Sequence, residues 1–165
     1  MDPTTIANIF DKVQPTGSNI FHEIATLGSM VLLNRVSKFV LPSLRFLLRE
    51  KNHSGQHCVH IVACIHSGQH AIDLMEKFVS LGANINAINP ILGESVLQVA
   101  VRCNNYKLVK WMCQHPVVDI NAVNKIGWTA YHQAYVQNNV QMMNILKTYG
   151  ADTTVPNENE RNESD

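Results

Sequence analysis

The sequence predicts an all-α fold, a solenoid of about four helix-turn-helix repeats joined by short hairpin loops. Glycine-led segments align without gaps and are spaced 38, 38 and 34 residues apart, at residues 17–22, 55–60, 93–98 and 127–132. A second marker, Gly-Ala-Asn or Gly-Ala-Asp, falls at residues 82–86 and 150–154, with a degenerate copy at 117–121. Apolar residues recur at helical spacing before these markers. Such a period indicates stacked units that bury their apolar faces against one another.

Composition and charge exclude several other classes of protein. The chain has 165 residues, 45% apolar and 16% charged, so it can form one stable domain without a disulfide or a metal. Its 13 basic and 13 acidic residues cancel, whereas nucleic-acid-binding modules usually carry an excess of Lys and Arg. No segment approaches the roughly 18 apolar residues of a membrane span, and no signal peptide opens the chain. We therefore expect an intracellular protein that binds neither membranes nor, directly, nucleic acid.

Residues 1–14 are predicted to form a helix that caps the stack. Asp2 can act as its N-cap, and Pro3 fits the first helical position because no partner is available there for an N–H group. Apolar residues then follow at helical spacing, namely Ile6, Ile9, Phe10 and Val13. A stack of repeats needs such a cap, since its end units would otherwise expose an apolar face.

The first repeat, at about residues 15–52, is predicted to have an enlarged second half. Pro42 interrupts an otherwise helical run that continues to Arg49. Proline lacks a backbone donor and clashes with the preceding turn of a helix. We therefore expect two helical pieces that meet near Leu41 and Pro42.

The other three repeats are placed at about residues 53–88, 89–124 and 125–154. Ser95 and Thr129 stand where an N-cap hydroxyl can accept from the first free amide groups of a helix. A histidine three residues after such a cap, as at His132, is placed to bond the backbone of the neighbouring repeat.

The second repeat is longer than the fourth. His60 precedes Gly82 by 22 residues, whereas His132 precedes Gly150 by 18. Both glycines stand where a left-handed residue can end a helix. We expect the four additional residues to form a loop insertion near residues 66–70.

Residues 155–165 are predicted to be a disordered acidic tail. After Val155 they contain no apolar residue, and they carry Glu158, Glu160, Glu163 and Asp165 against Arg161. Segments so poor in apolar residues cannot bury enough surface to offset the entropy lost on folding. The zero net charge is therefore the sum of a mildly basic stack and a short acidic end.

No residue pattern predicts an enzyme, a metal site or a cofactor site. His57, Cys58, His60 and Cys64 are metal-ligating residue types, but no second cluster completes a tetrahedral set at finger-like spacing. The sequence contains no nucleophile elbow, phosphate-binding loop or His-Glu-x-x-His motif. We expect all four cysteines, which include Cys103 and Cys113, to be free and buried.

Large apolar residues at two hairpin tips are the candidate protein-binding residues. Tips of this kind are normally polar, and exposed apolar groups on a rigid edge mark partner sites. The predicted contact residues are Asn89, Ile91, Leu92, Lys125, Ile126 and Trp128, with Glu158 and Glu160 of the tail. The alternative is that these tips pack against the neighbouring hairpins.

The repeats resemble those of the ankyrin family over about residues 15–154. The fourth repeat reads Gly-Trp-Thr-Ala-Tyr-His-Gln-Ala at residues 127–134, similar to the ankyrin motif Gly-x-Thr-Pro-Leu-His-x-Ala. The segments Asn-Ile-Phe-His-Glu-Ile-Ala at 19–25 and Cys-Val-His-Ile-Val-Ala at 58–63 narrow the resemblance. They look like the I-kappa-B-like ankyrin proteins of bracovirus-type polydnaviruses, which parasitoid wasps carry.

This resemblance implies a function and a partner. An I-kappa-B-like protein binds Rel/NF-kappa-B transcription factors of the host, blocks their nuclear entry or DNA binding, and suppresses insect immune signalling. It is expected in the host cytoplasm, with the nucleus as a second location. No Asp-Ser-Gly-x-x-Ser segment precedes the first repeat, so the resemblance implies an inhibitor without a degradation switch. A generic ankyrin adaptor for another host partner and a homo-oligomer formed through Ile91, Leu92 and Trp128 are the alternatives.

Overall fold

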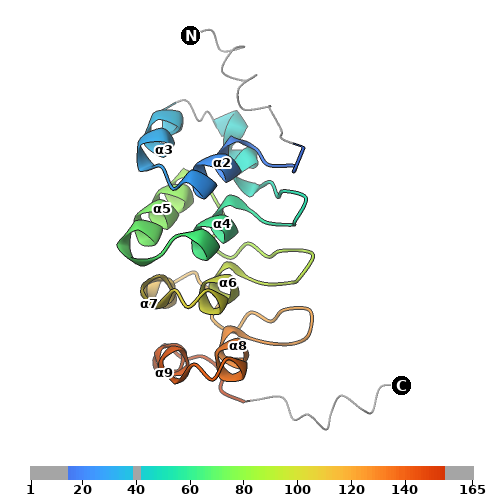
Figure 1. The fold of residues 1–165 in the computed structure, drawn as a ribbon, viewed down its shortest axis with the longest axis vertical. Coiled ribbons are helices and arrows are strands. Elements are labelled where there is room, and N and C mark those ends of the chain that lie inside the picture. The colour runs from blue at the N-terminus through green and yellow to red at the C-terminus, as the bar shows by residue number, and fades with distance from the viewer. Residues whose placement is uncertain (1–14, 39–41, 155–165) are drawn as a thin grey trace, which may run out of the picture.

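The computed structural model describes residues 15–38 and 42–154, and these residues form a stack of helix pairs (Figure 1). In chain order the elements are α2 Ile20–Leu27, α3 Met30–Ser37, the 3-10 helix η1 Pro42–Arg49, α4 Cys58–Ile65, α5 Gly68–Leu81, α6 Val96–Arg102, α7 Tyr106–Gln114, α8 Ala130–Val136 and α9 Val140–Thr148. The predicted all-α solenoid of helix-turn-helix units is confirmed. The predicted capping helix at residues 1–14 and acidic tail at 155–165 lie outside the described residues.

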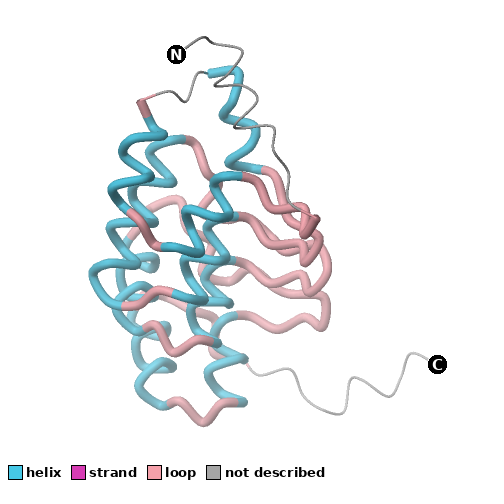
Figure 2. The backbone as a smooth tube through the Cα atoms, turned by 45° about the horizontal axis from the view of Figure 1, so that its top comes forward, coloured by secondary structure: helices cyan, strands magenta, loops and turns pink. Residues whose placement is uncertain are grey.

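The helices form two layers with a row of hairpins along one side. An inner layer contains α2, α4, α6 and α8, and an outer layer contains α3, α5, α7 and α9 (Figure 1). Each helix of the second, third and fourth units packs against the equivalent helix of the next or preceding unit. The hairpins project from the inner layer and lie one above another (Figure 2). Each unit therefore buries its apolar stripe only when a neighbour is present.

The inner helices begin at side-chain caps. The hydroxyl of Ser95 accepts from the backbone N–H of Gln98 at 3.2 Å, and that of Thr129 accepts from the N–H of His132 at 3.4 Å. In return, the side chains of Gln98 and His132 accept from the backbone N–H groups of their caps. Both predicted caps are confirmed, and each satisfies two amide groups that a helix start would leave unpaired.

Each inner helix donates one side-chain hydrogen bond to a backbone carbonyl oxygen further along the chain. The donor lies three residues after the cap, and the acceptor is a backbone carbonyl oxygen, of the next repeat in the first three pairs and of the end of the fourth repeat in the last pair. The pairs are His22 Nε2 to Gln56 (3.0 Å), His60 Nε2 to Glu94 (3.3 Å), Gln98 Nε2 to Trp128 (2.6 Å) and His132 Nε2 to Thr154 (2.6 Å). The predicted bond across the repeat boundary is confirmed for His22 and His60, whereas His132 bonds to the end of its own repeat. We call this series of four bonds the side-chain ladder.

The core runs between the two layers along the length of the stack. Its largest fully buried side chains include Phe21, Phe78, Leu74, Met75, Leu97, Leu108, Met112, Met142 and Leu146. The rings of Phe21 and Phe78 meet edge to face with centroids 6.5 Å apart, which joins α2 to α5. Burial of one such side chain contributes about 1.5–3 kcal/mol, so the stack is stabilised mainly by these inter-unit contacts.

The additional residues of the second repeat do not form a loop, so that prediction is wrong. Only His66 and Ser67 separate α4 from α5, and α5 has 14 residues where α7 has 9. The helix begins more than a turn earlier because Ala71 and Ile72 extend its buried stripe. The ring of His66 donates from Nε2 to the carbonyl of Ala25 at 2.7 Å, which fixes the short connection.

The second half of the first repeat contains two helical pieces, α3 and η1. Their predicted junction near Leu41 falls among residues 39–41, outside the described part of the chain. Leu47 and Leu48 of η1 are buried, and the amide of Asn19 donates to the carbonyl of Leu47 at 2.8 Å. The irregular segment is therefore anchored to the cap of α2.

The four cysteines are free, but the prediction that all four are buried is wrong. Cys58 and Cys113 are buried, Cys103 is partly buried and Cys64 is exposed. Cys64 lies four residues after His60, at the position that Arg102 occupies in the third repeat, where the inner helix faces away from the core. Helical apolar periodicity alone does not distinguish that position from its buried neighbours.

Candidate protein-binding surface

Asparagine side chains shape the hairpin tips. The Oδ1 atom of Asn124 accepts from the backbone N–H groups of Ile126 (3.1 Å) and Trp128 (3.0 Å). Asn52 binds the N–H groups of Ser54 and Gln56 in the same way, at 3.0 and 2.9 Å. An asparagine that bonds to the backbone two residues ahead holds a tight turn. The tips are therefore preorganised before any partner binds.

The hairpins also pack against one another. Gly93 has a φ of +73°, and a Cβ atom on it would lie 2.6 Å from the backbone nitrogen of Lys125 in the next hairpin. Gly55 approaches the side chain of Asn89 as closely. The amide of Asn89 donates to the carbonyl of Ser54 at 3.1 Å. The hairpins therefore contact one another along their backbones, as the alternative interpretation expected. The row of hairpins forms one surface.

Further asparagines join the bases of the hairpins. Asn86 donates from its amide to the carbonyl of Val117 at 2.5 Å and accepts from the N–H of Asp119 at 3.1 Å. Asn121 accepts from the N–H of Asp152 at 2.8 Å. Sequence reasoning marked these segments as repeat ends but missed the role of the asparagines. These asparagines recur at the same position of the repeat, and this recurrence could have predicted their role.

The outer side of this row is apolar. We define the hairpin edge as the exposed apolar residues Ile88, Ile91, Leu92, Val123 and Ile126. Ile91, Leu92 and Ile126 are predicted contact residues and are 53–63% exposed, and the predicted Lys125 lies exposed among them. Ile88 and Val123 were missed. Each stands two residues after a repeat-end asparagine, so alignment of the repeats would have found them.

Two predicted contact residues are hydrogen-bonded into the scaffold. Asn89 is 5% exposed, and its Oδ1 atom accepts from the N–H of Ile91 at 2.8 Å, so its side chain shapes the turn and has little surface to offer a partner. Trp128 is half-buried and anchored at both backbone groups, by Asn124 and Gln98. Glu158 and Glu160 lie outside the described residues.

The buried histidines and cysteines near this surface are in unreactive states. Burial lowers the pKa of His60 to about 4 and also lowers the pKa values of His22 and His57. These rings are neutral at pH 7, and His22 and His60 must be, because their Nδ1 atoms accept from the backbone N–H groups of Asn19 and His57. Burial raises the pKa of the Cys58 thiol to about 12, which leaves little of the nucleophilic thiolate. The described residues contain no group of three or more His, Cys, Asp and Glu side chains arranged to hold a metal.

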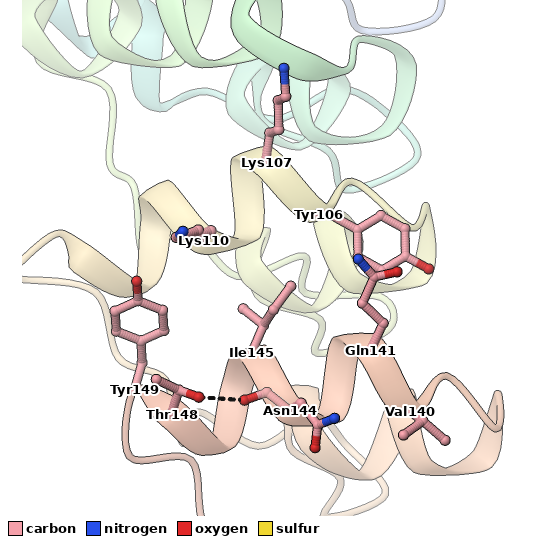
Figure 3. A pocket seen from close by; sticks show the side chains of 9 residues that line it. All are labelled: Tyr106, Lys107, Lys110, Val140, Gln141, Asn144, Ile145, Thr148 and Tyr149. Atoms are coloured by element: carbon pink, nitrogen blue, oxygen red, sulfur yellow. Dashed lines mark hydrogen bonds between the residues drawn. The ribbon is translucent and has the colours of Figure 1, made fainter.

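A groove lies on the opposite, outer face between α7 and α9 (Figure 3). Its volume is about 720 Å³, and Ile145 lies between walls that include Tyr106, Lys110 and Tyr149. The exposed Lys107 and Lys110 belong to the solvated face of the outer helices. The groove is open and carries polar side chains at its rim, whereas the hairpin edge consists of large exposed apolar side chains on two neighbouring hairpins.

Comparisons with known proteins agree with this architecture. Residues 59–157 match the family model "Ankyrin repeats (3 copies)". The I-kappa-B like protein N2 of Microplitis demolitor bracovirus (isolate Webb) is 37% identical over 139 residues, which cover 82% of this chain and 75% of that protein. The I-Kappa-B like protein G1 of the same virus is 37% identical over 131 residues, which cover 79% and 73%.

A solved structure has the same fold. It is the ankyrin repeat domain of Bcl-3, described as a unique member of the IkappaB protein family. The similarity has a TM-score of 0.79 at 21% identity and covers 93% of this chain and 67% of that one. Within the described part of this chain, every helix is too short or too polar to cross a membrane.

Proposed function

This chain belongs to the ankyrin repeat family and, within it, to the I-kappa-B-like proteins, and on that premise we propose that it binds a Rel/NF-kappa-B transcription factor. Binding withholds the factor from the nucleus or from DNA and thereby suppresses immune signalling in the host insect. The protein acts without catalysis, in the host cytoplasm and, where the factor has already entered, in the nucleus.

The hairpin edge is the observation that carries this proposal. Ile91, Leu92 and Ile126 expose more than half of their surface, although folding gains nothing from an apolar side chain left in water. The asparagine turns and the close contact at Gly93 hold the row rigid. A rigid apolar row loses little conformational entropy when it is covered, so most of the burial energy is available for binding.

The chemistry of the edge indicates what part of the factor it meets. Its centre is apolar, and the exposed Lys125 lies beside it. The bidentate pair of Arg102 with Glu94, whose Nη2 and Oε2 atoms are 3.2 Å apart, leaves that glutamate neutralised. A folded domain with an apolar patch is therefore a better match than a strongly basic segment.

The test is capture of Rel proteins from immune-stimulated insect cells, combined with a nuclear translocation assay. The double variant Ile91→Gln/Ile126→Gln is expected to lose most captured Rel protein, because truncation of a central apolar anchor costs about 2 kcal/mol or more. Val140→Gln is the matched control, since Val140 is equally exposed but lies at the start of α9. Absence of Rel protein from the wild-type capture would overturn the proposal and favour an adaptor for another host partner.

A further inference from the structure

Two cysteines meet across the boundary between the second and third units. Cys64 lies near the end of α4, and Cys103 is the C-cap residue of α6. These two helices are neighbours in the inner layer (Figure 1). A side-chain hydrogen bond joins the two thiol groups. Because the sulfur atoms of a disulfide are about 2 Å apart, a hydrogen-bonded pair of thiols needs only a local movement to form one.

The repeat itself places these two positions side by side. Cys64 and Cys103 occupy consecutive positions of consecutive repeats, the fourth and fifth residues after the ladder side chain. In the next pair of units the same positions hold Arg102 and Gln137. The amide of Gln137 donates to the backbone carbonyl of Arg102 at 3.3 Å. The contact between the cysteines is therefore a regular neighbour relation of the solenoid.

The two thiols differ in access to solvent and in acidity. Cys64 is exposed, whereas Cys103 is partly buried. Burial and the hydrogen bond with Cys64 raise the pKa of the Cys103 thiol to about 11, so this thiol is protonated at pH 7. Arg102, which pairs with Glu94, lies close enough to interact with both thiols, and a nearby guanidinium favours the thiolate form that oxidants attack. Cys64 is therefore the residue that a dissolved oxidant meets first, and Cys103 is the thiol that can complete a disulfide.

We propose that Cys64 and Cys103 form a redox-sensitive modification site, at which a peroxide converts the two thiols to a reversible disulfide bond. The sulfur of Cys64 attacks one oxygen of hydrogen peroxide, the O–O bond breaks, and the leaving hydroxide takes the proton of that thiol to give water. The sulfur of Cys103 then attacks the sulfenic acid on Cys64. The S–O bond breaks, and hydroxide leaves with the Cys103 proton as a second water. The peroxide is reduced, and the two thiols are oxidised.

The disulfide ties the end of α4 to the end of α6. It closes a loop of about 40 residues, and a cross-link of this kind stabilises a fold chiefly by restricting the unfolded chain. The site lies at the ends of the inner helices, whereas the hairpins precede their starts (Figure 2). The bond therefore leaves the hairpin edge free. The inference does not rest on the binding of a Rel factor, and either proposal can fail without the other.

Peptide mapping of the full chain before and after treatment with hydrogen peroxide tests the proposal. With the remaining thiols blocked by iodoacetamide, the peptides that contain Cys64 and Cys103 are expected to be linked to each other. The titratable thiols of the denatured chain should fall from four to two, and dithiothreitol should restore them. The melting temperature of the oxidised chain is expected to lie about 10 °C above that of the reduced chain.

Three variants assign the roles of the cysteines. Cys103→Ser should form no linked peptides and keep a sulfenic acid on Cys64, which dimedone traps. Cys64→Ser should give neither product. Cys113→Ser removes a buried thiol of α7, so it is the matched control and should form the linked peptides like the wild type. Circular dichroism shows whether each variant is folded, and the map of the wild-type chain decides the question if Cys113→Ser is not.

Several results would contradict the proposed site. Persistence of all four thiols under peroxide would overturn it. So would further oxidation of Cys64 without a bond to Cys103, or a bond between the Cys64 residues of two chains. A melting temperature that oxidation leaves unchanged would also overturn it, because the bond would then not hold the two units together.

Discussion

The second and fourth units present the same repeat positions to different surroundings. Met75 lies between two neighbouring units and is fully buried, whereas Met143, the same residue type at the same position, is only partly buried and has a neighbouring unit on one side only within the described residues. Ala63 of the second unit is also fully buried, whereas Tyr135, at the same position of the fourth unit, is 49% exposed. Burial in a solenoid is therefore decided by the presence of the next unit as much as by the residue. Matched substitutions in the two units can separate these contributions.

The largest expected effect is the difference between Met75→Ala and Met143→Ala. Removing a fully buried Met side chain leaves a cavity and costs about 2–5 kcal/mol of unfolding free energy. Met143→Ala should cost less than half as much, because part of that side chain is already in water. Urea unfolding followed by circular dichroism measures both values. Equal losses would mean that the end of the stack is as well packed as its interior.

Acid should destabilise the interior junction through His60. Its pKa is about 6.5 when unfolded and about 4 when folded, since burial lowers it. Its stabilising contribution is complete above pH 6.5 and is lost as the pH falls toward 4, by up to about 3 kcal/mol.

His60→Gln provides the control for this pH dependence. Gln98 makes the same ladder bond in the third unit, from its amide to the carbonyl of Trp128. The variant should therefore keep most of the stability at pH 7 and lose less of it between pH 6.5 and 4. An unchanged acid profile would assign the pH dependence to other groups, such as His22 and His57.

Glycine substitutions compare an interior hairpin with the last one. Gly93 and Gly127 have nearly the same positive φ, +73° and +77°, but a Cβ atom added to Gly93 would meet atoms within 4 Å, whereas one added to Gly127 would meet open space. Gly93→Ala is expected to cost about 1–3 kcal/mol, from backbone strain and the contact with Lys125. Gly127→Ala should cost about 1 kcal/mol, from the strain alone. Thermal unfolding of the two variants would show whether hairpin stacking adds stability.

The smallest effect is expected at the helix caps. Ser95 accepts a hydrogen bond from the N–H of Gln98, whereas the side chain of Ser67, the N-cap of α5, makes no capping bond. Ser95→Ala should cost about 1 kcal/mol, and Ser67→Ala close to nothing. A similar loss in both variants, measured by urea unfolding, would contradict the assignment of the caps.

The sequence was sufficient for features that depend on local chemistry. The caps at Ser95 and Thr129 and the ladder histidines follow from residue types at fixed spacing. The length of α5 did not, because four additional residues fit a loop or a longer helix equally well. The burial of Asn89, the exposure of Cys64 and the anchoring of Trp128 depend on neighbouring units, which repeat spacing alone does not describe.

The side-chain ladder also determines how the molecule yields to a mechanical pull. Each of the first three rungs joins an inner helix to the next hairpin, and the last rung, from His132 to Thr154, connects α8 to the segment after α9. A motor that draws on the C-terminal end would break this rung first and then detach one unit at a time. We expect a force–extension trace with successive small steps, in which the second unit, with its long α5 and its contact to Phe21, yields after the fourth.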